Sequence, residues 1–189
     1  MVDLTKFYTD LATEIHAHNV RVGWWDDPDE CLFQKLQLVS TEVAEATEGA
    51  RKNIMDTHLV NRKMEEVEYA DAMIRMLDLG GRLKLDYISD EAAHHLCIPT
   101  NSVGCQHLGI NAAIVGMAVS LRSYQYASDR RILKQIVNED YSEVINSIVK
   151  VASNRNCSLF TAIEAKREYN AQRADHKREN REKADGKKF

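Results

Sequence analysis

The sequence predicts an all-α fold, and three observations support this prediction. Apolar residues recur every three or four positions along most of the chain, which is the spacing of one helix face. Only 8 glycines and 2 prolines occur among 189 residues, fewer turn-forming residues than an all-β fold needs. The hydrophobic share of 44% and the charged share of 29% are ordinary for a globular domain. We therefore expect a helical bundle with about six main helices.

The first half of the chain predicts three of these helices. The first covers residues 4–19 and ends before a loop that contains Gly23 and Pro28. The second covers residues 30–52, and the third covers residues 58–82, where a pair of glycines ends it. Because only a short break separates the second helix from the third, we expect these two helices to lie antiparallel and side by side.

The second half predicts three more helices after a weakly patterned stretch. Residues 83–106 lack clear periodicity and are interpreted as an inserted loop. Two helices follow at residues 108–127 and 130–153. The last helix covers residues 159–180, and Ser158 is its expected N-terminal cap.

Composition limits the class of protein further. No linker is visible, so residues 1–180 are expected to form a single domain, with residues 181–189 as a charged, mobile tail. A net charge of -4 argues against binding to nucleic-acid polymers. The chain has neither an apolar run of about 18 residues nor an N-terminal signal segment, which predicts a cytoplasmic protein without a transmembrane helix.

Two pairs of acidic residues are the strongest functional signal. Glu42 and Glu45 lie three positions apart in the second predicted helix, and Glu68 and Asp71 have the same spacing in the third. Residues three apart share a helix face, so neighbouring helices would bring four carboxylates together. Carboxylate oxygens are the ligands that hard divalent cations such as Mg²⁺ prefer. The pattern predicts a metal cluster.

A solvated acidic face is the alternative, and it requires an opposite charge three or four residues away. Glu48 satisfies this requirement through Arg51 and Lys52. Three of the four paired acids have no such neighbour, and Asp71 has only Arg75. Asp71 also stands where a core hydrophobe is expected on its helix, which favours the metal site.

Basic residues late in the chain could hold phosphate. Lys166, Asn170 and Arg173 recur at helical spacing in the last predicted helix. Such a stripe is more often an exposed helix face, but beside a metal cluster it becomes a plausible phosphate clamp. Lys35 and Lys52 are further candidates for this role, although Lys35 can equally be solvated.

Aromatic residues before the second helix are candidates for binding a nucleobase. Trp24 and Trp25 lie in the loop, where they could stack on a base or simply anchor the loop by burial. His16 and Asn19 lie one helical turn apart and could donate or accept hydrogen bonds at the edge of the same base. Either of them could equally be a solvated residue at the end of the helix.

A group of histidines and cysteines near the middle of the chain has the residue types of a zinc site. Its spacing fits no standard zinc pattern, so we favour incidental histidines and buried cysteines. The group consists of His94, His95, Cys97, Cys105 and His107.

The acidic pairs and their surroundings resemble the motif of a known family. EVAEATEGARK followed by EEVEYADAMIRMLDL is similar to the E-x-x-E … E-x-x-D signature of MazG-like all-α nucleoside triphosphate pyrophosphohydrolases. Lys166, Asn170 and Arg173 match the later K…N..R stretch of that family. The resemblance covers most of the chain and is weakest over residues 83–127, while the C-terminal end looks like phage members of the family.

The resemblance implies hydrolysis of a (d)NTP to (d)NMP and pyrophosphate with Mg²⁺ or Mn²⁺. Glu42, Glu45, Glu68 and Asp71 match the family's catalytic metal ligands. The phage MazZ-type members look most similar; they prefer dGTP and GTP and supply dGMP for 2-aminoadenine nucleotides, which would place a phage-encoded protein in the host cytoplasm. The family also implies a homodimer or homotetramer.

Two alternatives remain open at the level of the sequence. The same fold could act on dUTP, dCTP or a broad set of nucleotides, because aromatic platforms and amide edges serve many bases. A protein of another class, a non-catalytic helical oligomer that binds nucleotides or proteins, would use the acids structurally or hold a metal without turnover. Glu45 and Glu65 are both candidates for the general base.

Overall fold

The computed structural model describes residues 3–27, 31–89, 101–127, 131–173 and 177–181, and these residues confirm the predicted all-α fold. The predicted tail at residues 181–189 lies outside the described residues except for Arg181. The helices are α1 (Leu4–Arg21), α2 (Leu32–Lys52), α3 (Met64–Leu83), α4 (Val103–Tyr126), α5 (Arg131–Asn154), α6 (Leu159–Gln172) and the short α7 (Arg178–Arg181).

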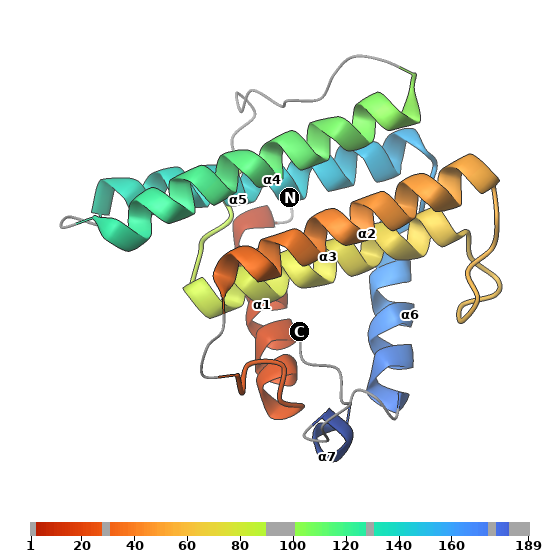
Figure 1. Cartoon of the computed structure of the whole chain (residues 1–189), viewed down its shortest axis with the longest axis horizontal. Helices are drawn as coiled ribbons and strands as arrows, with labels where there is room; N and C mark the ends of the chain where they lie inside the picture. The colour runs from red at the N-terminus through yellow and green to blue at the C-terminus, as the bar shows by residue number, and fades with distance from the viewer. Residues whose placement is uncertain (1–2, 28–30, 90–100, 128–130, 174–176, 182–189) are drawn as a thin grey trace.

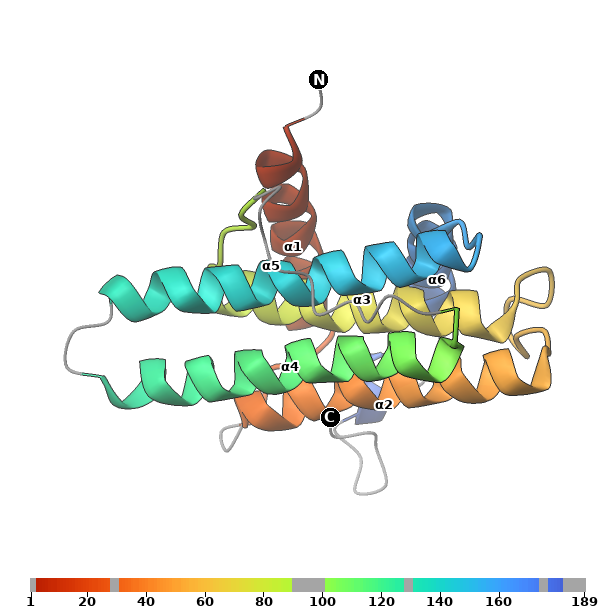
Figure 2. The same ribbon diagram turned by 90° about the horizontal axis from the view of Figure 1, so that it is seen from above.

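Four long helices form the body of the molecule. α2, α3, α4 and α5 run roughly along one direction in both views, whereas α1 and α6 cross them steeply and extend to the same side (Figures 1 and 2). α2 and α3 are antiparallel, as predicted, because Gly49 approaches Met64 at one end while Glu42 reaches Arg75 at the other. The two acidic helices are therefore direct neighbours.

α3 is the central helix and packs against α1, α2, α5 and α6. Its second half is buried on all sides over residues 76–80. Gly80 and Gly81 were expected to end this helix, but they lie inside it, and the left-handed residue that follows the helix is Lys84 with a φ of 52°. A methyl group at Gly80 would overlap the Tyr141 ring, so this glycine serves close packing of α3 on α5.

The predicted start of the third helix is wrong by six residues. Residues 54–63 form a loop in which Met55 pairs with Lys63 in an isolated antiparallel bridge. The buried Asp56 carboxylate accepts the backbone N–H groups of His58 and Leu59, at 2.9 and 2.6 Å. An Asx turn of this kind competes with helix formation, so α3 begins only at Met64.

The last helix also differs from its prediction. α6 ends at Gln172, and the extended backbone of Arg173 (ψ 133°) breaks the continuous helix that was expected to reach residue 180. Ser158 occupies the expected N-cap position but makes no capping hydrogen bond with its side chain. Its backbone N–H donates instead to Glu66 on α3, at 3.1 Å, which ties the start of α6 to the central helix.

α4 begins at Val103, five residues earlier than the sequence predicted. By length and composition alone it could cross a membrane, since one 18-residue window has a mean hydropathy of 1.3, and 44% of that window is buried in the bundle. The search of the sequence for a continuous apolar run missed this helix, because glycine, serine and asparagine interrupt its apolar residues. Among the described residues α4 alone meets this test.

Candidate metal centre

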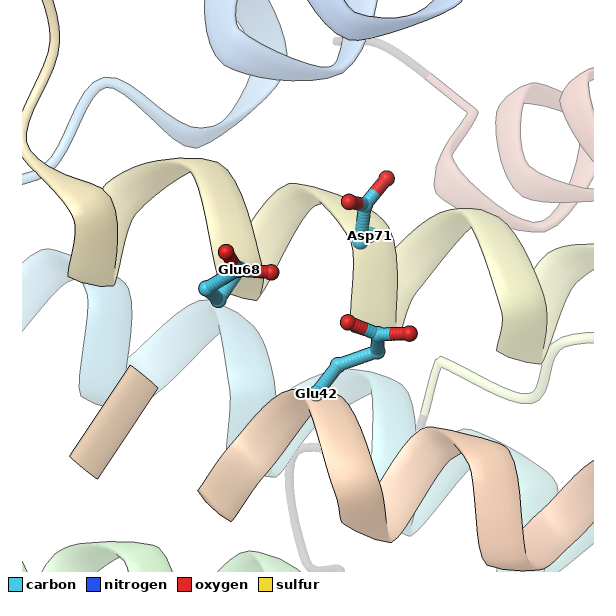
Figure 3. Close-up of side chains that lie close together, drawn as sticks. All are labelled: Glu42, Glu68 and Asp71. Carbon is cyan, nitrogen blue, oxygen red and sulfur yellow. The ribbon is translucent and has the colours of Figure 1, made fainter. Parts of the chain in front are cut away.

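Three of the four predicted acids meet in space. Glu42 extends from α2, and Glu68 and Asp71 extend from α3, and the three side chains lie close together (Figure 3). One carboxylate oxygen of each residue lies within 4.8 Å of the others. Glu42 and Glu68 are buried, and Asp71 is half-buried. Three hard oxygen donors at this spacing fit a divalent cation such as Mg²⁺ or Mn²⁺.

Two basic side chains neutralise part of this negative charge. Arg75 Nε donates to Glu42 Oε1 at 2.5 Å, and Lys166 Nζ lies 2.7 Å from Asp71 Oδ2. Spacing along one helix could not reveal this partner of Glu42, because Arg75 lies on the neighbouring helix. Arg75, the expected partner of Asp71, forms its ion pair with Glu42 instead.

Among the described residues, the third acid, Glu68, forms no ion pair, and its pKa reflects this. Burial, with the nearby Asp71 and Glu42 carboxylates, raises the pKa of Glu68 to about 9. Burial also raises the pKa of Asp71, although Lys166 opposes the shift through its ion pair. For Lys166, burial lowers the pKa, but Asp71 and the other acids around it outweigh this and raise it overall. Lys166 therefore remains a cation in the site.

Glu45 and Glu65, the two candidates for the general base, occupy different environments. Glu45 is exposed and lines the pocket described below, close enough to Glu68 to contribute to its raised pKa. Glu65 is only 2% exposed and accepts two hydrogen bonds from Arg155, at 3.0 and 3.1 Å. Glu45 is therefore available to a ligand, whereas Glu65 belongs to an ion pair between α3 and Arg155, the residue that follows α5.

The three acids lie in a cavity of about 990 Å³. α2 and α3 form its floor, and α1 and α6, which flank this side of the bundle in Figure 1, form its walls. Lys35, Glu45, Asn170 and Arg173 line the same cavity, so residues from α2 and from the end of α6 share one site with the three acids. A volume of this size accommodates a nucleotide.

Other predicted phosphate ligands divide into two groups. Asn170 Oδ1 is buried without a hydrogen-bond partner among the described residues, and Arg173 lies 5.7 Å from the Tyr169 ring centroid. Lys35 Nζ donates to the Trp24 carbonyl oxygen at 3.1 Å, which fixes the loop before α2. Lys52 is not among the cavity-lining residues and pairs with Glu48 at 2.6 Å.

The predicted base-binding residues surround a buried acid that the sequence analysis missed. Asp78 accepts hydrogen bonds from His16 (2.8 Å), Asn19 (2.7 Å) and the Trp25 indole N–H (2.9 Å). Lys35 Nζ lies 4.8 Å from the Trp25 ring centroid, so this ring already has a cationic neighbour. Asp78 thus holds α1 and the loop of Trp25 onto α3.

Asp78 escaped notice for a specific reason. Arg75 and Arg82 lie three and four residues from it, the pattern of an acid on a solvated helix face. In the structure Arg75 turns to Glu42, and Arg82 lies over the Trp25 ring at 5.4 Å. Trp24, Trp25 and Asn19 line the cavity, whereas His16 lies behind Asp78 and is not among the lining residues.

One described residue of the suspected zinc cluster, His107, is structural, and another, Cys105, is a half-buried free thiol. His107 is buried in α4, where its Nε2 lies 2.5 Å from the Tyr69 hydroxyl and its Nδ1 lies 2.6 Å from the Thr47 hydroxyl. Thr47 also donates to the Val43 carbonyl oxygen at 2.9 Å, so Nδ1–H donates to Thr47 and the Tyr69 hydroxyl donates to Nε2. Burial lowers the pKa of His107 to about 4. His94, His95 and Cys97 lie outside the described residues.

Comparisons with protein-family models, with characterised proteins and with solved structures gave no match. The site itself combines three carboxylates that can hold a hard cation, an exposed carboxylate beside them, and cationic and amide side chains in the same cavity. This combination suits a ligand that carries several phosphate groups bridged by metal.

Proposed function

We propose that the protein is a metal-dependent nucleoside triphosphate pyrophosphohydrolase, which cleaves a (d)NTP to a (d)NMP and pyrophosphate. The observation that carries the proposal is the buried group of Glu42, Glu68 and Asp71 on the floor of a nucleotide-sized cavity. The resemblance of the two acidic motifs to the MazG-like family supports the same reaction.

The reaction requires an activated water as nucleophile and a positive charge that stabilises the phosphate oxygens. Water must attack the α-phosphorus while the bond from this phosphorus to the oxygen bridging to the β-phosphorus breaks. Mg²⁺ or Mn²⁺ bound by the three carboxylates would neutralise phosphate oxygens and lower the pKa of a bound water. Glu45, the exposed carboxylate beside the group, would accept the proton of the attacking water.

The remaining residues would position the substrate. Arg173 and Asn170 lie on the α6 side of the cavity, where the guanidinium and the Asn170 Nδ2–H groups can donate to phosphate oxygens of the departing pyrophosphate. Trp24 and Asn19 lie at the α1 side, which suits them to the nucleoside. Lys166 becomes available to phosphate only when its ion pair with Asp71 is relaxed.

A product analysis tests the proposal directly. The protein is incubated with each ribonucleoside and deoxyribonucleoside triphosphate in Mg²⁺ or Mn²⁺, and pyrophosphate and orthophosphate are measured separately. We expect (d)NMP and pyrophosphate, with dGTP and GTP tested first because the phage MazZ-type members prefer them. Release of orthophosphate would contradict the reaction type. Divalent-cation binding without turnover of any nucleotide would favour the non-catalytic helical oligomer.

A further inference from the structure

One face of α3 carries a row of four charged side chains that all line the cavity: Glu68, Asp71, Arg75 and Asp78. Their spacing of three, four and three residues keeps them on one side of the helix over about 15 Å. Glu68 and Asp71 belong to the metal centre, whereas Asp78 binds α1 through its hydrogen bonds to that helix. Arg75 lies between these two groups and is the one cation of the row.

The guanidinium of Arg75 has donors that the protein itself does not use. Its Nε–H donates to Glu42 Oε1 at 2.5 Å, which holds the group at the edge of the metal centre. No described residue accepts a hydrogen bond from its two terminal Nη groups. The side chain is 26% exposed and lines the cavity, so these donors are open to a ligand.

The other lysine and arginine side chains of the cavity lie elsewhere or are already paired. Among the described residues they are Lys35, Lys166, Arg167 and Arg173. Lys166 and Arg167 form ion pairs with acids of α3 and α1. Lys35 donates to the loop before α2, and Arg173 follows the last turn of α6. The Arg75 guanidinium is therefore the cation between the metal centre and the α1 side of the cavity.

The α-phosphate of a nucleotide belongs at this position. It joins the nucleoside, assigned to the α1 side, to the outer phosphates, assigned to the α6 side. In the proposed reaction the water oxygen bonds to the α-phosphorus, and the bond to the bridging oxygen breaks with its electron pair leaving on pyrophosphate. Negative charge is then spread over the non-bridging oxygens around the reacting phosphorus. A donor that binds these oxygens more strongly as the charge develops lowers the barrier.

We propose that Arg75 is a catalytic residue that donates from an Nη group to one non-bridging oxygen of the α-phosphate. This inference rests on the proposed nucleotide hydrolysis and assigns a role to a residue that the sequence presented only as a helical neighbour of Asp71. Glu42 would orient the planar guanidinium through the Nε–H group. A lysine at this position would keep the positive charge but lose the oriented, planar pair of donors.

Kinetics of Arg75→Met and Arg75→Lys test the proposal, with saturating Mn²⁺ and the triphosphate that the wild type cleaves fastest. We expect Arg75→Met to lower kcat by on the order of a hundredfold or more and Arg75→Lys by about tenfold. KM should change little, because the contact strengthens only as charge develops. Arg51→Met is the matched control: Arg51 is 77% exposed, pairs with Glu48 and is not among the cavity-lining residues, so its removal should leave kcat and KM unchanged.

The two diastereomers of the α-thiotriphosphate distinguish a direct contact from an indirect one. Each has sulfur in place of one non-bridging α-phosphate oxygen, and sulfur is a weak hydrogen-bond acceptor. The Arg75 variants should slow one diastereomer as much as the natural substrate and the other much less, because sulfur has already weakened the contact there. If Arg75 acted only by orienting Glu42, both diastereomers would be slowed equally.

Binding measurements report on the same site without turnover. Calorimetry with Mn²⁺ alone, and with Mn²⁺ and a non-hydrolysable α,β-methylene triphosphate, should give the same dissociation constants for Arg75→Lys as for the wild type. This result is expected because lysine keeps a positive charge beside Glu42 and the lost contact belongs to the transition state. Circular dichroism confirms that each variant is helical.

The outcomes separate this inference from the proposed function. Pyrophosphate release by the wild type, with unequal slowing of the diastereomers and unchanged binding in Arg75→Lys, supports the role of Arg75. Full activity of Arg75→Met, equal slowing of both diastereomers, or weaker Mn²⁺ binding by Arg75→Lys overturns that role and leaves the hydrolysis standing. A wild type that releases no pyrophosphate overturns both.

Discussion

Replacing Lys166 by Met tests whether this lysine neutralises the Asp71 carboxylate in the absence of a divalent cation. Lys166 and Asp71 form an ion pair at 2.7 Å with side chains that are 7% and 17% exposed. Removing one partner of a buried ion pair typically costs about 3 kcal/mol of unfolding free energy. We expect this loss in the metal-free protein, because Met retains the packing of the lysine stem without its charge.

Divalent cation should reduce that loss. With Mn²⁺ or Mg²⁺ in saturating amounts, the cation neutralises the carboxylate left by Lys166→Met, and we expect the loss to shrink to about 1 kcal/mol. The difference of about 2 kcal/mol corresponds to metal binding that is about thirtyfold tighter in the variant. Urea unfolding with and without the cation measures the first quantity, and titration calorimetry measures the second.

Lys52→Met is the control for this experiment. Lys52→Met removes a lysine that pairs with Glu48 at the surface, with the two side chains 59% and 41% exposed, and should change neither quantity measurably. If Lys166→Met lost the same stability with and without the cation, and bound metal no more tightly than wild type, Lys166 would not compete with the metal for Asp71.

Three further predictions concern the acids and the packing of α3. Glu42→Gln and Asp71→Asn should each abolish turnover and weaken divalent-cation binding in calorimetry while the helical circular dichroism remains; full activity of both would exclude these acids as metal ligands. Because the pKa of Glu68 is raised to about 9 in the fold, the folded protein binds one more proton than the unfolded chain between about pH 4.5 and 9. Metal-free stability should therefore fall as pH rises through that window, and Glu68→Gln should flatten the dependence in thermal melts; an equally steep slope in this variant would assign the effect to other groups. Gly80→Ala should destabilise by about 1–3 kcal/mol because its methyl group meets Tyr141, whereas Gly104→Ala, which meets nothing within 4 Å, should be neutral or stabilising in urea unfolding.

The helices could be predicted because their signals are local. Apolar spacing located all six long helices, and the short break between the second and third helices indicated their antiparallel packing. Helix ends were less predictable, since they depend on single contacts. The Asp56 turn delays α3, and the two glycines that resembled a helix end instead allow α1 and α5 to approach it closely.

The site was partly predictable for the same reason. The three-residue spacing found Glu42, Glu68 and Asp71, because each helix presents them on one face. Their cationic partners could not be assigned from spacing, since Glu42–Arg75 joins α2 to α3 and Asp71–Lys166 joins α3 to α6. The hydrogen bonds of Asp78 to α1 and to the Trp25 loop are equally remote in sequence.

For the proposed nucleotide hydrolysis, the position of α3 has a consequence for how substrate preference could change. This one helix carries two of the three acids and also packs against four other helices, so a substitution along it alters folding and chemistry together. The loops at residues 22–27 and 53–63 border the cavity with Trp24, Trp25 and residues 54–58 while contributing little to the central core. Except at Trp25 and Asp56, whose hydrogen bonds stabilise the fold, the proposed selectivity can therefore diversify in these two loops without loss of the scaffold. A combinatorial library for new nucleotide substrates is best confined to them.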